Sequence, residues 1–116
     1  MYQQKEKTME SLNRIELIGR VGYVNRNKIG SLENVTFSVA TTYEYKAEDN
    51  APVIETTWHK VTAWRGDKIT DETLDAIHEW AEVKVVGRLR AIRYTDAEGN
   101  ERSTYEVLAH EVEVVK

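Results

Sequence analysis

Cysteine is absent from the 116-residue chain, which excludes disulfides, thiolate nucleophiles and metal sites built on cysteine. The chain also lacks any apolar run approaching the roughly 18 residues of a membrane-spanning helix. Its N-terminal segment, MYQQKEKTMES, is polar throughout and therefore does not resemble a secretory signal. We accordingly expect no membrane contact and a cytoplasmic location.

Positive charge is not in surplus either, because the formal net charge is −4. This total argues against a polyanionic partner only if charges of the two signs are mixed evenly over the surface. A content of 41% hydrophobic and 31% charged residues is typical of a globular protein, and the length suits one domain. We expect a flexible arm over residues 1–11 and a single domain over residues 12–116.

Alternating apolar residues, separated by turn residues, predict a chain made mainly of strands. The strands are expected at residues 12–24, 35–45, 56–66, 82–95 and 102–115, and one helix is expected at residues 70–80. Gly19 and Gly22 interrupt the first strand, as a bulge or a tight bend in a barrel would. A single helix between the third and fourth of five strands indicates an all-β fold, the five-stranded antiparallel OB-fold barrel.

The same periodicity predicts which side chains form the core. They are Val35, Phe37 and Val39 in the second strand, Val61 and Ala63 in the third, Leu74, Ile77 and Ala81 on the helical stripe, and Val83, Val85 and Leu89 in the fourth. Residues 25–30, NRNKIG, are expected to form a turn. Thr70 is expected to cap the helix.

The third strand carries two tryptophans on the face opposite its small apolar residues. Trp58 and Trp64 are six positions apart, so both project from one face of a strand, with Lys60 between them. The fourth strand has a comparable face, which carries Lys84, Arg88, Arg90 and Tyr94. If the two faces adjoin, they suit a single nucleic-acid strand, whose bases stack on aromatic rings and whose phosphates attract cations. Alternatively, either tryptophan packs beneath a loop or against another subunit.

No catalytic arrangement is visible in the sequence. The three histidines, His59, His78 and His110, are not spaced as metal ligands are. The GRVG of residues 19–22 lacks the lysine and the strand-to-helix context of a phosphate-binding loop. We therefore expect a protein that is not an enzyme and that uses no cofactor or metal.

Three segments, NRIELIGRVG, TTWHKVTAWRGDK and VVGRLRAIRYTDAEGNERSTYEV, resemble bacterial single-stranded DNA-binding proteins, in order, over about residues 12–115. The Trp-His pair at residues 58–59 and the segment from Gly87 to Asp96 are the most specific parts. The resemblance implies sequence-independent binding and protection of single-stranded DNA in DNA replication, repair or recombination. It also implies a homotetramer, or a homodimer, joined partly through the first strand.

The resemblance further implies which aromatic residues contact DNA: bases are expected to stack on Tyr45, Trp58, Trp64 and Tyr94. From the strand alternation, phosphates are expected to contact Lys60, Lys84, Arg88 and Arg90. Tyr43 is the alternative to Tyr45 at the first of these positions.

The chain departs from the family pattern at three places, one of which is an extra residue before Lys68 in WRGDK. YVNRN follows the first-strand glycines, where members usually carry an acidic residue and a proline. The chain ends at EVEVVK, without the flexible segment and acidic tip with which members recruit replication and repair enzymes. Either the tail is absent by nature or the sequence is the core of a longer protein, and tail-mediated recruitment is not expected in the first case. The alternative function is an OB-fold protein-interaction module, such as a primosomal replication factor, which would be expected to lose most of the stacking aromatics that this chain keeps.

Overall fold

The computed structural model describes residues 10–115, so all but the last two residues of the expected arm at 1–11 lie outside the described part. The elements in chain order are β1 (Ile15–Ile29), β2 (Leu32–Lys46), β3 (Pro52–Trp64), α1 (Asp71–Ala76), β4 (Glu82–Thr95) and β5 (Glu101–Val114). This order, with one helix between β3 and β4, is the one predicted. None of the helical segments within residues 10–115 has the length and apolarity that crossing a bilayer requires.

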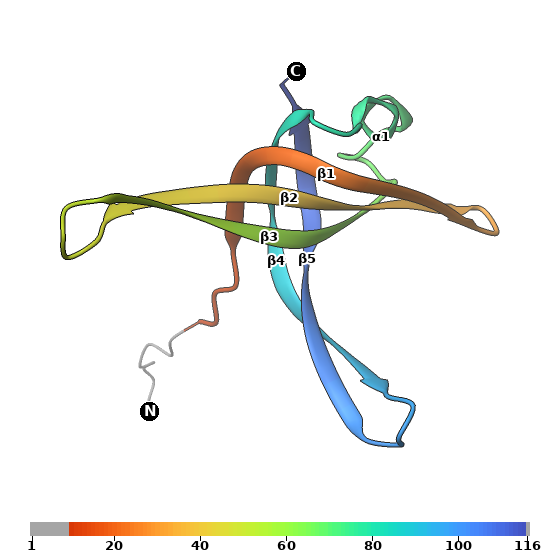
Figure 1. Cartoon of the computed structure of the whole chain (residues 1–116). Coiled ribbons are helices and arrows are strands. Elements are labelled where there is room, and N and C mark those ends of the chain that lie inside the picture. The colour runs from red at the N-terminus through yellow and green to blue at the C-terminus, as the bar shows by residue number, and fades with distance from the viewer. Residues whose placement is uncertain (1–9, 116) are drawn as a thin grey trace, which may run out of the picture.

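The five strands close into a barrel with the strand order β1-β2-β3-β5-β4 (Figure 1), which confirms the OB-fold prediction. Neighbouring strands are antiparallel except at the closure, where β3 and β5 form a short parallel pair at Val61–Val107 and Thr62–Leu108. β1 takes part in both halves of the barrel. It pairs with β4 over Ile15–Arg20 and with β2 over Arg20–Ile29.

A bend in β1 makes this double pairing possible. The register with β2 shifts between Val21 and Val24, as the interrupting glycines predicted. Gly19 lies so close to β2 that an added Cβ atom would overlap the carbonyl oxygen of Ala40. Only glycine allows the two backbones to approach this closely.

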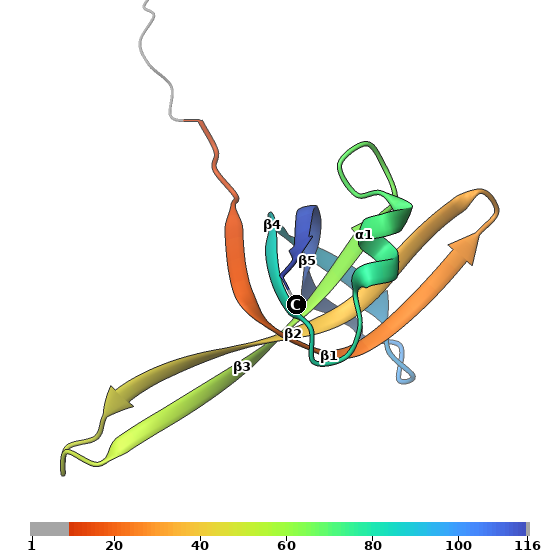
Figure 2. The same ribbon diagram turned by 90° about the horizontal axis from the view of Figure 1, so that it is seen from above.

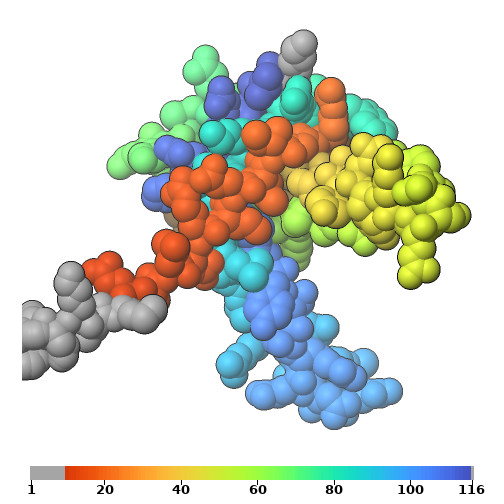
Figure 3. Space-filling view, turned by 90° about the vertical axis from the view of Figure 1, so that its left-hand side faces the viewer, coloured from red at the N-terminus to blue at the C-terminus, as the bar shows by residue number. Residues whose placement is uncertain are grey.

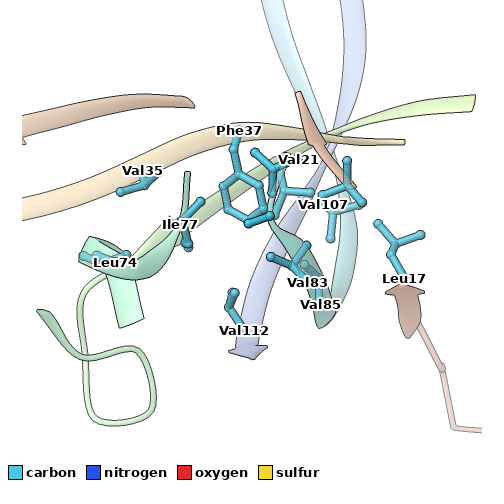
Figure 4. Packing of buried hydrophobic residues seen from close by; sticks show 14 of the residues in the cluster. Leu17, Val21, Val35, Phe37, Leu74, Ile77, Val83, Val85, Val107 and Val112 are labelled. Carbon is cyan, nitrogen blue, oxygen red and sulfur yellow. The ribbon is translucent and has the colours of Figure 1, made fainter. Parts of the chain in front are cut away.

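The core occupies the barrel interior and one open end of the barrel, which α1 covers (Figure 4). Every predicted core residue except Leu89 is buried. Leu89 is 42% exposed, so the prediction for this residue is wrong. Pairing of β1 with β4 ends at Gly87, and beyond this point Leu89 lies at the barrel rim, where the side chain of Asn13 bonds its backbone N–H and C=O.

Three hairpins extend beyond the barrel as arms (Figures 1 and 2). We call them the β1–β2, β2–β3 and β4–β5 arms. The first contains residues 25–29, which were expected to form a turn but continue β1 as far as Ile29. Arg26 explains the difference, because its guanidinium bonds Glu33 on β2 and Asp75 on α1 and holds the arm beside the helix.

The helix is shorter than the expected span of residues 70–80. It begins as predicted, with Thr70 Oγ1 accepting the N–H of Thr73 at 3.2 Å. It ends at Ala76, because the following backbone bonds β1 instead: Trp80 N–H donates to the Val21 carbonyl at 2.8 Å, and Val21 N–H donates to the Ala81 carbonyl at 2.9 Å.

We predict that Gly19→Ala lowers the free energy of unfolding by about 3 kcal/mol, because the added methyl group separates β1 from β2. Urea denaturation measures the change. Gly66→Ala is the matched control, since the nearest atom to its added Cβ is the Trp64 carbonyl oxygen at 4.0 Å, and it should change the stability by less than about 1 kcal/mol. Equal losses in the two variants would show that the β1–β2 contact is not tight.

Candidate nucleic-acid interface

The outer face of β3 carries the three residues that the alternation predicted. Val61 and Ala63 are fully buried, whereas Trp58 is 57% exposed and Lys60 is exposed. Trp64 is half-buried on the same face. The aromatic side chains therefore lie outside the barrel, with the lysine between them.

The indole of Trp58 lies across β2 and above β1. A Cβ atom added at Gly22 would lie 2.6 Å from Cζ3 of Trp58 and 2.6 Å from Oγ of Ser38. The Ser38 hydroxyl accepts the N–H of Tyr23 at 3.0 Å, which ties the two strands together under the ring. Gly22 thus leaves room for an indole that lies flat on the barrel and keeps much of its surface in solvent.

Trp64 has a different environment. It borders the loop from Gly66 to Ile69 and lines an open groove of about 330 Å³ that reaches His110. Its half-buried side chain beside this loop is compatible with the alternative in which a tryptophan packs beneath a loop.

The predicted cation Arg90 is held by a buried carboxylate. Glu106 is only 4% exposed, and its carboxylate accepts Nε of Arg90 at 2.9 Å and Nη2 at 2.8 Å. The same carboxylate accepts the hydroxyl of Thr62 at 2.9 Å. This chain of bonds crosses from β4 through β5 to β3, and it neutralises much of the Arg90 charge beside the aromatic face.

The other three predicted cations lie in different surroundings. Lys60 and Arg88 are exposed and make no ion pair within residues 10–115. Lys84 is exposed at the opposite end of β4, where it pairs in register with Glu113 and shares a groove with Lys68 and Glu111. The four cations therefore do not form one basic patch.

The two predicted tyrosines lie on arms rather than on the barrel. Tyr45 is on the β2–β3 arm, with its ring centroid 5.9 Å from that of Tyr43. In the β2–β3 register Ala40 is opposite Trp58 and Val53 is opposite Tyr45, so Tyr45 and Trp58 are on opposite faces of the ladder. Tyr94 is half-exposed on the β4–β5 arm, opposite Arg102. Both arms project from the body of the molecule (Figure 3).

The tip of the β4–β5 arm is ordered by Asp96. Its carboxylate accepts the backbone N–H groups of Glu98 and Asn100 and the guanidinium of Arg102 at 2.9 Å. The bond from Arg102 is the main reason why the pKa of the Asp96 carboxyl lies below its usual value, and the backbone bonds lower it further. This tip fixes the hairpin that carries Tyr94.

Sequence reasoning missed several exposed side chains that belong to the same surfaces. They are Arg93 and Tyr105 on the second face of the β4–β5 arm, Arg102 at its tip, and Trp80 before β4. Tyr105 is two positions from the buried Val107, so alternation places it on the core side of β5, but it lies beyond the barrel rim and is exposed. Trp80 was assigned to the helix, which concealed its exposure.

His59 is half-buried, bonds the Thr41 hydroxyl at 2.8 Å, and has a pKa lowered by burial. No cluster of three or more potential metal-ligating His, Asp or Glu side chains occurs within residues 10–115.

Comparison with known proteins identifies related chains. The model of the single-strand binding protein family matches residues 12–115. The chain is 34% identical over 110 residues to "Single-stranded DNA-binding protein 1" of Xylella fastidiosa, covering 92% of this chain and 79% of that protein. It is 31% identical over 108 residues to the mitochondrial single-stranded DNA-binding protein of Drosophila melanogaster, covering 91% and 73%.

A solved structure shares the fold. It is described as "Plasmodium falciparum SSB complex with ssDNA", and it superposes with a TM-score of 0.77 at 23% identity, covering 94% of this chain and 97% of that one.

We predict that Arg90→Ala lowers the free energy of unfolding by about 2 kcal/mol, because it leaves the buried Glu106 carboxylate without its partner. Arg93→Ala, on the same arm and without an ion pair within residues 10–115, should change it by less than about 0.5 kcal/mol. Chemical denaturation tests both. In a Glu106→Gln background the Arg90→Ala loss should shrink to about 0.5 kcal/mol, and an undiminished loss would contradict the pairing.

Proposed function

The chain belongs to the single-strand binding protein family, and on this premise we propose that it binds and protects single-stranded DNA with little dependence on base sequence. The proposed settings are DNA replication, repair or recombination in the cytoplasm. It acts by binding alone, without catalysis, cofactor or metal.

The exposed indole of Trp58 beside Lys60 is the observation that carries the proposal. An aromatic ring that is 57% exposed on a barrel face is well placed for an unpaired base, and stacking contributes roughly 1–3 kcal/mol per base. The ammonium of Lys60 is free of ion pairs within residues 10–115 and is available to a phosphate. Neither contact distinguishes one base from another.

The remaining predicted residues extend this contact along the strand. Trp64 offers a half-buried ring, and Tyr45 or Tyr43 and Tyr94 offer rings on the two arms. Among the predicted cations, Arg88 also makes no ion pair within residues 10–115. Arg90 and Lys84 contribute less, since Glu106 neutralises the first and Glu113 lies opposite the second.

The acidic net charge is compatible with a polyanionic ligand, because many carboxylates lie away from this face. Asp71, Asp75, Glu79 and Glu82 are on or next to α1. The β3 face itself carries no acidic residue between Trp58 and Trp64. The local field at the site, rather than the net charge, determines the attraction of phosphates.

We predict that two substitutions separate stacking from charge. Trp58→Ala should weaken the binding of oligo(dT) by roughly 1–3 kcal/mol at every salt concentration, because stacking releases few ions. Lys60→Ala should instead reduce the slope of log affinity against log salt by about 0.7, the value for one phosphate on a single strand. Fluorescence anisotropy of a labelled oligonucleotide across a salt series measures both.

A duplex competitor provides the control for this experiment. Duplex DNA of the same length should compete weakly, because its bases are already stacked and cannot reach the rings. Equal competition by duplex would overturn the stacking proposal and assign the exposed tryptophans to a protein interface.

We further propose a homotetramer, or a homodimer, that pairs subunits partly through β1. Residues 15–18 of β1 have β4 as a partner on one edge, and within residues 10–115 no strand pairs with the other edge. An open edge of this kind favours pairing with another strand.

We predict that light scattering at micromolar concentration gives a mass that is a multiple of the 13.4 kDa chain. Ile18→Pro is the substitution to use for disrupting pairing through this edge, because Ile18 is at an exposed position of the open segment. Leu17→Pro would disturb the core instead. A wild-type mass of one chain would remove the oligomer proposal and would leave the proposed DNA binding unaffected.

A further inference from the structure

Trp80 has a backbone conformation that is unfavourable for a large side chain. Its φ angle is 70°, and within residues 10–115 the other non-glycine residue with positive φ is Asn50, a type that tolerates this region. A bulky residue held in the left-handed region costs free energy, and such strain often occurs at functional sites.

The conformation is imposed by backbone bonds that any residue can make. Trp80 N–H donates to the Val21 carbonyl at 2.8 Å, and the Trp80 carbonyl accepts Nη1 of Arg20 at 3.1 Å. Glycine at position 80 would keep both bonds without the strain. The indole itself contributes little to packing, because Trp80 is 73% exposed. Stability of the fold therefore does not explain why this residue is a tryptophan.

The position of Trp80 next to β1 connects it with the proposed DNA-binding face. Val21, which bonds Trp80, precedes Gly22, which lies under the ring of Trp58. The turn that leads into β4 lies beside β1 in both views of the ribbon (Figures 1 and 2). Arg20 and Gly22 alternate with the buried Val21 on β1, so both lie on the outer face of this strand.

We propose that Trp80 is a further base-stacking position for single-stranded DNA, with Arg20 beside it facing the backbone of the strand. The inference rests on the proposed function and deepens it, because it extends the path of the strand beyond Trp58 to the turn before β4. Arg20 makes no ion pair within residues 10–115, so its guanidinium has N–H groups available for a phosphate oxygen.

The charges around Trp80 and Arg20 determine whether the proposed DNA contact is made mainly by electrostatic attraction or mainly by stacking. Glu82 is opposite Arg20 in the β1–β4 register, and Glu79 directly precedes Trp80. Two carboxylates beside one guanidinium leave no net positive charge. The contact is therefore made mainly by stacking, and its loss should leave the salt dependence of binding nearly unchanged.

A protein with Trp80 as its sole tryptophan tests the contact directly. Trp58→Phe and Trp64→Phe together retain aromatic rings on β3 and remove their indole emission. Saturating oligo(dT), with binding followed independently by the anisotropy of a fluorescein label, should quench the emission of Trp80. The inference is overturned if oligo(dT) binds and the emission of Trp80 does not change. It is also overturned if the emission of Trp80 varies with protein concentration and not with DNA.

Two substitutions in the otherwise unchanged chain provide a second test. Trp80→Gly should raise Tm by about 3 °C through relief of strain and weaken oligo(dT) binding about tenfold, with the same salt slope. Trp80→Phe, which keeps a ring in the same conformation, should leave Tm nearly unchanged and retain most of the affinity. Trp80→Gly that binds as tightly as the unsubstituted protein would overturn the inference.

The result also distinguishes this inference from the proposed function. If Trp58→Ala weakens binding and Trp80→Gly does not, only the additional stacking position is wrong. If the unsubstituted protein does not bind oligo(dT) at low salt, the proposed function fails, and the inference about Trp80 fails with it.

Discussion

The close approach of β1 to β2 at Gly19 is the constraint on which the rest of the structure depends. Because β1 bends there, it pairs with β4 before the bend and with β2 after it, and one strand completes both halves of the barrel. Further along β1, Gly22 lies beneath the side chain of Trp58, where the missing side chain of the glycine leaves space for the indole. The geometry that closes the core therefore also shapes the outer face.

The candidate interface consists of a rigid centre and two projecting parts. Trp58, Lys60 and Trp64 lie on a barrel whose core is fully packed, whereas the tyrosines lie on two-stranded arms. A two-stranded ribbon without a core is marginally stable by itself. The arms are thus the natural places for adjustment to a flexible strand, and the barrel face provides the preorganised contact.

Charge around the site depends on pairing more than on composition. Glu106 is buried and bonds Arg90 and Thr62, so its carboxylate connects three strands and Arg90 offers a reduced positive charge to solvent. Lys60 and Arg88 lack such partners within residues 10–115. A count of basic residues on one strand consequently overstates the positive charge that a phosphate encounters there.

The amino-acid sequence by itself determined the features that follow from local periodicity. Alternation identified the five strands, the buried Phe37 and the outward-facing Trp58, because a strand presents successive side chains to opposite faces wherever it lies. Tertiary structure alone decided the features that depend on distant partners. The side chain of Asn13 bonds the backbone of Leu89 at the rim, and Glu106 pairs with Arg90. The Val21 backbone bonds Trp80, which ends the helix early and forces Trp80 into a strained conformation. These partners are separated by up to 76 residues, and no local pattern specifies which groups the closing barrel brings together.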